Sequence, residues 1–260
     1  PRGGIGSRSG DRHLAFPAMA GAQPRGSSGR SLGVHRPARA AVRLPAPIIF
    51  SPNSIIQPDP GRAMGHGHKF DVKKLERLRD PERLSYLNPD KIWAVIGDDG
   101  MKTVIDLGAG IGFFAIPFSR KLSAGVLYAC DLSAEMIAHL NEALRHEGVG
   151  NVVAVKTGEV EVPLDDGIAD LVFMVNLHHE FDQPLQSLRE CRRLLRPGGR
   201  IAVIDWAPVD SPSGPPRHVR FEPETVRDQL RGVGFEDVQS HSLLPYHFVI
   251  TSRTAETEDN

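Results

Sequence analysis

Residues 104–114 constrain the fold of this chain more than any other segment, because they join an apolar run to three closely spaced glycines and then to more apolar residues. The β-branched run Thr103–Leu107 predicts a buried parallel strand, and the glycines predict a turn whose backbone can lie directly against a ligand. From Phe113 the apolar residues continue with helical spacing, so we expect that ligand at a helix N-terminus. The three glycines are Gly108, Gly110 and Gly112. This order of strand, turn and helix predicts a nucleotide-cofactor site.

The residues around the glycines favour a cationic ligand over a dinucleotide. A GxGxxG fingerprint has its third glycine where this chain has Phe113. Asp106 stands two residues before the first glycine, where an acid is unfavourable beside a diphosphate but suits an ammonium or sulfonium group. A second strand-like run, 125–130, leads to Asp131, which is placed to accept hydrogen bonds from a ribose diol. Together the two acids indicate S-adenosylmethionine.

These residues resemble motif I and its acidic follow-on in the class I S-adenosylmethionine-dependent methyltransferases. Later segments extend the resemblance: Gly158–Glu159 after a third strand-like run (151–156), a fourth run (170–176) that leads into the loop 176–182, and the turn 194–199 before a fifth run (200–205). The resemblance covers roughly residues 68–252 and implies methyl transfer as the activity.

The resemblance implies an α/β protein with a three-layer Rossmann-like methyltransferase fold. Its sheet would be seven-stranded and mostly parallel, with a C-terminal antiparallel hairpin. Strand-like runs at 235–242 and 246–252 match that hairpin, whereas a dehydrogenase would more often continue with further βα units. Residues 223–231 are expected to form a helix, and the Pro- and Gly-rich segment 206–216 a loop on the substrate side.

The resemblance assigns parts of the cofactor to individual residues. Asp106, Gly108 and Gly110 would hold the methionine end, Asp131 the ribose, and Glu159 the adenine side. The expected cofactor-binding residues are Asp106, Gly108, Ala109, Gly110, Gly112, Asp131, Leu132, Glu159 and Asn176. A purely structural role stays open for the two aspartates, because each could cap the helix that follows it.

The chemistry of S-adenosylmethionine demands little covalent participation from the protein, which mainly orients the acceptor and excludes water. A base need only remove a proton from the acceptor. His178 and His179 are the leading candidates, because they follow the fourth strand and imidazole has a reference pKa near 6.5. Either side chain could instead only pack or cap. Weaker candidates are Glu180, Asp205, Tyr246 and His247.

No metal site is expected. The histidines form no HExxH motif and no Cys/His cluster. Cys130 and Cys191 make no CxxC pair, so neither a disulfide framework nor a zinc site is indicated, and a thiol-dependent arsenite methyltransferase is disfavoured. The histidines considered as ligands are His66, His68, His178, His179 and His247.

The acceptor class is constrained mainly by what the chain lacks. The loop that begins at Asn176 has no Asn/Asp-Pro-Pro-aromatic turn, which relatives use to methylate exocyclic amines of bases or glutamine amides. A small molecule with an oxygen or carbon nucleophile is therefore expected, and general likeness to the ubiquinone and menaquinone methyltransferases implies a quinone-like or phenolic one. The sequence His178–Asp182 departs from theirs, which leaves the acceptor open. No nucleic-acid partner is expected.

The first 63 residues differ in composition from the rest of the chain. They hold nine Arg, no Lys and two acids, a formal charge of +7 that leaves −8 for residues 64–260. Gly, Pro, Arg, Ala and Ser dominate them without sustained periodicity, so we expect a disordered leader. A transit peptide, a basic nucleic-acid-binding arm and a segment that is not a natural part of the protein are alternatives, and we favour the last, with Met64 as the true start.

The remaining chain divides into three parts. Residues 64–98 are expected to form a helical N-terminal cap that lies over the cofactor and helps exclude water, with helix starts at Asp80–Pro81 and Asn88–Pro89. The methyltransferase core would be residues 99–252, and residues 253–260 a disordered tail. For the cap, simple packing on the sheet is an equally valid interpretation.

Two other functions stay open on sequence grounds: a catalytically silent S-adenosylmethionine-binding protein and a NAD(P)-dependent oxidoreductase. Phe113 and the terminal hairpin argue against the second. No stretch approaches the roughly 18 consecutive apolar residues of a membrane span, so a cytoplasmic protein is expected. The sequence does not indicate an oligomeric state.

Overall fold

The computed structural model describes Leu78, residues 80–98 and residues 100–256. The chain divides into two units, 1–63 and 64–260, and every described residue belongs to the second unit. The predictions for the leader 1–63, for the start at Met64 and for the tail beyond residue 256 lie outside the described residues.

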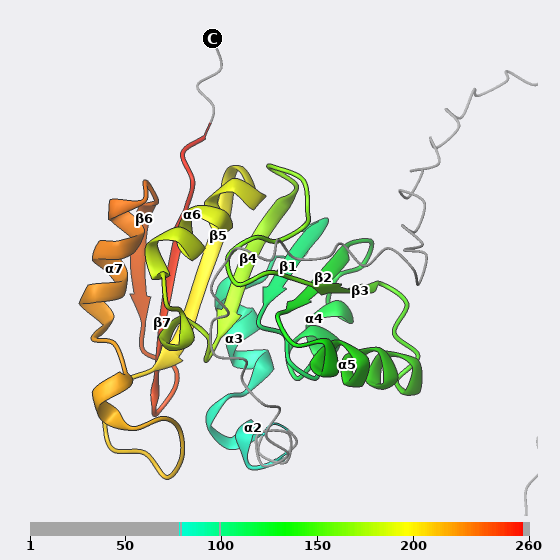
Figure 1. The fold of residues 1–260 in the computed structure, drawn as a ribbon, viewed down its shortest axis with the longest axis horizontal. Coiled ribbons are helices and arrows are strands. Elements are labelled where there is room, and N and C mark those ends of the chain that lie inside the picture. Colours follow the sequence, from blue (N-terminus) through cyan, green and yellow to red (C-terminus); the bar gives the residue numbers. More distant parts are fainter. Residues whose placement is uncertain (1–77, 79, 99, 257–260) are drawn as a thin grey trace, which may run out of the picture. The chain divides into compact units, whose positions relative to one another are not determined.

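Seven strands form one sheet in the order β3-β2-β1-β4-β5-β7-β6 (Figure 1). Four neighbouring pairs are parallel, whereas β7 runs antiparallel to both β5 and β6. The strands are β1 (Thr103–Leu107), β2 (Val126–Asp131), β3 (Val152–Lys156), β4 (Ala169–Val175), β5 (Leu195–Trp206), β6 (Glu236–His241) and β7 (His247–Arg253). The predicted mostly parallel sheet with a C-terminal antiparallel hairpin is confirmed.

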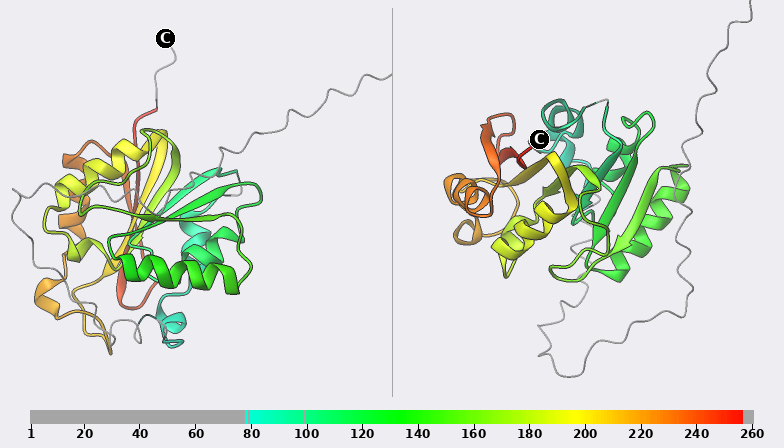
Figure 2. Two further views of the ribbon diagram at one scale, coloured as in Figure 1. Left: turned by 45° about the vertical axis from the view of Figure 1, so that its right-hand side comes forward. Right: turned by 90° about the horizontal axis from the view of Figure 1, so that it is seen from above.

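Helices cover both faces of the sheet and give three layers, as Figures 1 and 2 show. Alternate residues of the central strands serve the two faces: Phe173 packs with α3, α4 and α5, and Met174 packs with α6 and α7. The helices are α2 (Arg83–Tyr86), α3 (Pro89–Ile96), α4 (Ala115–Ser119), α5 (Ala134–His146), α6 (Pro184–Leu194) and α7 (Pro223–Gly232), with the 3-10 turns η1 (His178–Glu180) and η2 (Arg217–Val219). Strands buried on both faces explain the continuous apolar runs of the sequence.

The helix starts follow the local chemistry of the sequence. The side chain of Asn88 accepts hydrogen bonds from Asp90 N and Lys91 N at 2.9 and 3.2 Å, and Pro89 occupies the first turn of α3, as predicted. The helix expected from Phe113 begins instead at Ala115, after a turn. Gly112, with a left-handed φ of 91°, lies in that turn directly before Phe113.

The predicted turn 194–199 is a bulge at the start of β5 rather than a separate connection. Ala169 pairs with Leu195, but Leu171 pairs with Arg200, so β5 carries several additional residues at this point. The predicted tail also begins too early, because Arg253 ends β7 and the hydroxyl of Thr254 donates to the carbonyl of Arg196 at 2.8 Å.

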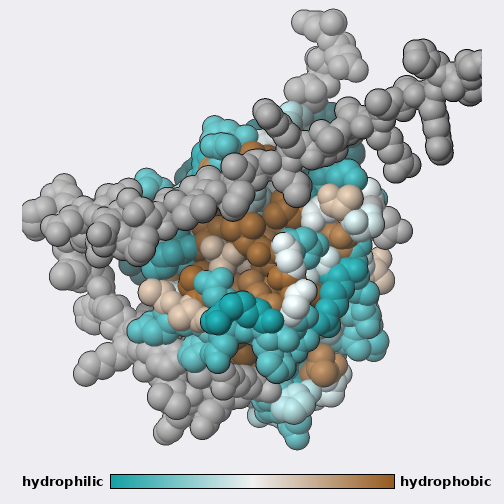
Figure 3. Space-filling view, turned by 90° about the vertical axis from the view of Figure 1, so that its right-hand side faces the viewer, coloured by the Kyte–Doolittle hydropathy of each residue, from teal (hydrophilic) through white to brown (hydrophobic). Residues whose placement is uncertain are grey.

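Strands β6 and β3 are the two edge strands of the sheet, and on β3 the side chain of Val153 is 45% exposed. Figure 3 looks onto the β3 edge, and hydrophobic residues occupy the centre of the face with hydrophilic residues around them. Within the described part of the chain, no helix combines the length and the apolar character that crossing a bilayer requires.

Candidate active site

The parallel strands β1, β2, β4 and β5 end at one edge of the sheet, where ligands bind in open α/β folds. Buried polar side-chain atoms without a hydrogen-bond partner concentrate at this edge. Among the described residues they belong to Asp106, Asn176, His178 and His247 and to two residues of α7, Arg227 and Gln229, of which Gln229 lies next to His178. Because such atoms are costly to bury, their clustering points to a site that a ligand completes.

The glycine loop, residues 108–112, uses its backbone N–H groups inside the protein. Gly108 N and Ala109 N donate to the Cys130 carbonyl at 2.8 and 3.0 Å, Gly110 N donates to Asp131 Oδ2 at 2.8 Å, and Gly112 N donates to the Ala109 carbonyl at 3.0 Å. A loop that cradles a diphosphate directs its N–H groups at the ligand. The glycine loop is therefore built to approach a ligand closely without supplying a phosphate cradle.

Asp106 lies at the end of β1 and is only 2% exposed. Burial raises its pKa well above the usual range, the nearby carboxylate of Asp131 raises it further, and the backbone N–H of Ala115 opposes the shift. Its Oδ2 atom has no hydrogen-bond partner. A ligand cation would satisfy that oxygen and stabilise the ionised form, so the site is suited to a positively charged group.

Asp131 connects the glycine loop to the end of β2. Its Oδ2 accepts from Gly110 N and its Oδ1 accepts from Ser133 N, each at 2.8 Å. Ser133, not Asp131, caps helix α5, because its hydroxyl accepts from Met136 N. The carboxylate is partly exposed and retains accepting capacity for a hydroxyl group.

The other residues predicted to bind cofactor differ in exposure. Leu132 is 51% exposed beside Asp131, and Glu159 is exposed in the loop after β3. Asn176 follows β4 with a φ of 57°, which points to a constrained turn. Its buried Oδ1 atom has no partner.

The two adjacent histidines occupy different environments. His179 Nδ1 lies 2.8 Å from Asp205 Oδ1, and His179 N donates to Asp205 Oδ2 at 2.9 Å. His178 is fully buried, with its ring edge-on to Phe181 and Phe221, and burial lowers its pKa. The structure thus joins His179 to the carboxylate at the end of β5 and places His178 among aromatic rings.

An aromatic cluster lies beside this pair and consists of Tyr86, Trp206, Tyr246 and His247. The His247 ring is 4.1 Å from the Trp206 ring between centroids, and Tyr86 stacks on His247 at 6.0 Å with an interplanar angle of 4°. Burial lowers the pKa of His247 to about 3, so its imidazole is neutral at physiological pH. The cluster therefore places several aromatic rings, tilted relative to one another, next to the His179–Asp205 pair.

The loop 207–216 folds back over Trp206 and is held by one arginine. Arg220 donates to the carbonyls of Ala207, Val209, Pro215 and Ser213 and to the hydroxyl of Ser211, at 2.8 to 3.5 Å. Its Cζ atom lies 5.3 Å from the Trp206 ring centroid. The loop borders a shallow, open pocket of about 570 Å³ lined by residues 209–217 and Arg220.

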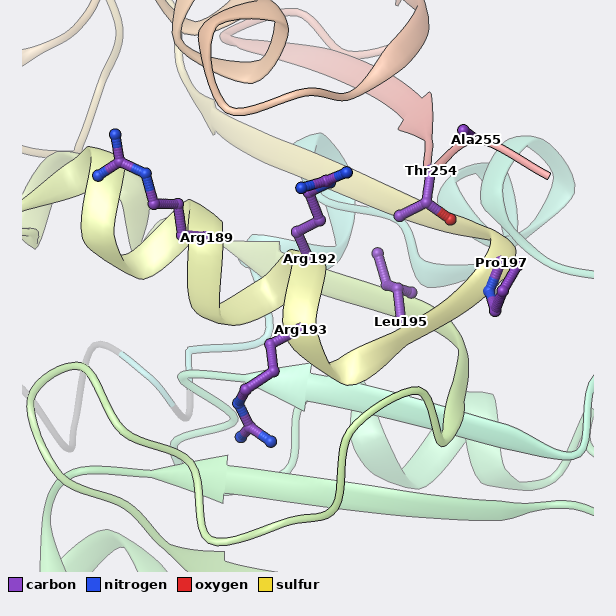
Figure 4. A pocket seen from close by; sticks show the side chains of 7 residues that line it. All are labelled: Arg189, Arg192, Arg193, Leu195, Pro197, Thr254 and Ala255. Carbon is purple, nitrogen blue, oxygen red and sulfur yellow. The ribbon is translucent and has the colours of Figure 1, made fainter. Parts of the chain in front are cut away.

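A second pocket, of about 430 Å³, lies by the bulge where β5 begins (Figure 4). It is at the opposite end of the parallel strands from Asp106. Its arginines Arg189, Arg192 and Arg193 project from α6 in different directions. Arg193 forms ion pairs with Glu190 and Asp166. The diverging guanidinium groups do not form one anion site.

No group of three potential metal ligands occurs in the described ranges. Burial raises the pKa of both cysteines, Cys130 and Cys191, which keeps them as thiols. His66 and His68 lie outside the described residues.

Comparisons with known proteins agree with this geometry. The family described as "Methyltransferase domain" matches residues 105–203. A solved S-adenosylmethionine-dependent methyltransferase from Aquifex aeolicus is 32% identical, with a TM-score of 0.68, and the match covers 72% of this chain and 100% of that one. The chain therefore belongs to the S-adenosylmethionine-dependent methyltransferases.

Curated relatives of known name are similar over shorter segments. The ubiquinone/menaquinone biosynthesis C-methyltransferase UbiE of Idiomarina loihiensis is 32% identical over 111 residues, which are 42% of this chain and 43% of that protein. The sarcosine/dimethylglycine N-methyltransferase of Halorhodospira halochloris is 31% identical over 186 residues, 66% of each chain. The chain spans about two fifths of the length of the first curated relatives that it matches.

Three residues that contribute to the site were not among the sequence predictions. Arg83, Trp206 and Arg220 act through contacts that depend on how α2 and the loop 207–216 fold over the strand ends. For Trp206 the sequence did offer a signal that it lies near the site, because it directly follows Asp205 at the end of an apolar run.

Proposed function

We propose that this chain is an S-adenosylmethionine-dependent methyltransferase whose acceptor is a small molecule with an oxygen or carbon nucleophile. The observation that carries the proposal is the glycine loop beside Asp106. Its N–H groups are used inside the protein, and the adjacent buried carboxylate lacks a partner, which suits a cationic cofactor and not a diphosphate.

The residues around the glycine loop fit S-adenosylmethionine. In this proposal Asp106, Gly108, Ala109, Gly110 and Gly112 hold the methionine end, and the unpartnered oxygen of Asp106 faces its positive charge. Asp131 accepts from the ribose hydroxyls, while Leu132, Glu159 and Asn176 line the nucleoside side. When bound, the cofactor supplies an electrophilic methyl group on a sulfonium.

We assign the base to His179 and not to His178. Because Nδ1 of His179 contacts Asp205, the proton of the neutral ring lies on Nδ1 and the lone pair on Nε2. Nε2 takes the proton that the acceptor loses as its oxygen or carbon attacks the methyl group, and Asp205 stabilises the imidazolium that results. His178, enclosed by Phe181 and Phe221, supports the fold of η1.

The choice of an oxygen or carbon nucleophile rests on likeness to the UbiE relatives and on the aromatic rings of Tyr86, Trp206 and His247 beside the site, which suit an apolar ring-containing acceptor. An amine acceptor is the competing choice, carried by the N-methyltransferase relative. The formal charge of −8 on residues 64–260 disfavours a polyanionic acceptor such as nucleic acid. A cytoplasmic location stays a prediction.

The proposal is tested by incubating the protein with a methyl-labelled donor and a fractionated cell extract. Label should appear in a small-molecule fraction with the wild type, and a His179→Gln variant should transfer it far more slowly. Label in nucleic acid or protein would contradict the acceptor class. Binding of the donor without transfer to any fraction would favour the catalytically silent alternative.

A further inference from the structure

Arg83 is a buried cation with no anionic partner among the described residues. Its side chain is only 9% exposed, and its one hydrogen bond among the described residues runs from Nη1 to the carbonyl of Leu78 at 2.7 Å. No described carboxylate lies within ion-pair distance of the guanidinium, and Asp80 on the preceding turn acts on it only at longer range. A buried charge is normally paired, because its desolvation is otherwise uncompensated.

The surroundings place Arg83 beside the glycine loop. Its Cζ atom lies 4.0 Å from the ring centroid of Phe113, the residue that directly follows Gly112. Leu78, which accepts the hydrogen bond from Arg83, has its Cδ1 atom 3.7 Å from the position that a Cβ atom on Gly110 would occupy. The guanidinium and its immediate neighbours therefore lie against the segment that we propose holds the methionine end.

Asp106 and Arg83 do not neutralise each other. The charged or ionisable neighbours that act on Asp106 and Arg83 differ: Asp131 for the first, Tyr86 and Asp80 for the second. A buried carboxyl group and a buried guanidinium thus flank one glycine loop, each lacking a salt bridge within the described ranges. The methionine end of S-adenosylmethionine carries an ammonium and a carboxylate, so this arrangement complements a zwitterion.

We propose that Arg83 binds the carboxylate of the methionine moiety, while Asp106 faces the cationic side. The inference rests on the proposed function and extends it, because it assigns to α2 a direct part in cofactor recognition. The planar guanidinium can donate two parallel hydrogen bonds to a carboxylate, and the ring of Phe113 fixes its orientation. The cofactor carboxylate would then pair with Arg83, and helix α2 would lie over the methionine end of the cofactor.

The test is calorimetric titration with three probes that differ in the methionine end. S-adenosylhomocysteine has both charges, its decarboxylated analogue keeps only the ammonium, and 5′-methylthioadenosine has neither. The variants are Arg83→Met, which keeps the apolar stem, and Arg83→Lys, which keeps the charge but not the planar fork. Arg189→Met, on the exposed face of α6, is the matched control. Thermal unfolding of each variant establishes that it is folded.

The wild type should bind S-adenosylhomocysteine more tightly than the decarboxylated analogue, by about tenfold to hundredfold for one charge-assisted contact. Arg83→Met should abolish that difference and leave 5′-methylthioadenosine affinity unchanged, Arg83→Lys should retain part of it, and Arg189→Met all of it. Equal loss of all three probes in a folded Arg83→Met protein, or no loss, would overturn the assignment. Failure of the wild type to bind S-adenosylhomocysteine would instead refute the proposed function.

Discussion

His179 Nδ1 and Asp205 Oδ1 lie 2.8 Å apart, although the two residues are separated by 26 positions in the sequence. The contact forms because β4 and β5 are parallel neighbours, so that the loop after β4 meets the end of β5. Asp205 also accepts from His179 N and from Trp206 N, which fixes its carboxylate. This relationship fixes the orientation of the His179 imidazole at the strand ends.

If His179 removes the acceptor proton, replacing it should slow methyl transfer without weakening cofactor binding. His179→Gln should lower the single-turnover rate by about 10²–10⁴-fold, the usual contribution of a general base. Asp205→Asn should lower it less, because the imidazole is retained but loses its orientation. His178→Gln is the control for a neighbouring imidazole. A His178→Gln loss as large as that of His179→Gln, in a folded protein, would contradict the assignment.

Replacing Asp106 with asparagine should stabilise the fold and weaken cofactor binding. The folded state raises the pKa of Asp106, so ionisation opposes folding at every pH above the unfolded value near 4. Asp106→Asn should therefore raise the free energy of unfolding at pH 7 by about 1–3 kcal/mol, and this gain should shrink as pH falls toward 4. Urea unfolding at several pH values measures it.

The same substitution should weaken S-adenosylhomocysteine binding, since the amide cannot offer a negative charge to the ligand ammonium. In the wild type, affinity should rise with pH as Asp106 ionises, and calorimetry in buffers of different ionisation enthalpy should detect proton release on binding. A pH-independent affinity that matches the variant would show that Asp106 does not face the ligand charge.

Gly108→Ala should destabilise the fold for two separable reasons. The residue has a φ of 77°, and an added Cβ would lie 2.8 Å from Leu177 Cδ2. Gly148→Ala is the matched control, because its φ is 63° but nothing lies within 4 Å of the added atom. The control should lose about 1 kcal/mol from backbone strain alone, and Gly108→Ala should lose more. Equal losses would mean that the Leu177 side chain moves aside freely.

Arg220→Ala should release the loop 207–216 from Trp206. The chain has two tryptophans, and a Trp93→Phe background leaves Trp206 as the only fluorophore of that kind. Acrylamide should then quench Trp206 several-fold more strongly in Arg220→Ala than in the parent. Arg217→Ala, whose exposed side chain has only a 3.8 Å contact with Asp210, should not change quenching. Unchanged quenching in Arg220→Ala would show that the loop stays closed without its arginine.

The sequence predicted the sheet well because its strands are continuous apolar runs bounded by turns and acids. The apolar runs around Asp106 and Asp131 predicted two strands and the position of an acid near the end of each. The family resemblance added the hairpin. The expected helix at Phe113 starts at Ala115 instead, after a turn with a left-handed Gly112 that the apolar spacing does not reveal.

The contacts between side chains were harder to predict from the sequence. Nothing in the local sequence distinguishes His178 from His179, since the difference between them depends on the register of β4 against β5. Arg83 was missed for a similar reason: on a four-residue helix it has the sequence context of an exposed arginine, and its contacts with Leu78 and Phe113 depend on the fold.

The most direct test of the central claim is calorimetric titration of the wild type and of Asp131→Ala with S-adenosylhomocysteine and with NADH. The wild type should bind S-adenosylhomocysteine, Asp131→Ala should bind it at least about tenfold more weakly through loss of charge-assisted hydrogen bonds, and neither should bind NADH. Tight NADH binding without S-adenosylhomocysteine binding would contradict the account of the glycine loop as a site for a cationic methyl donor.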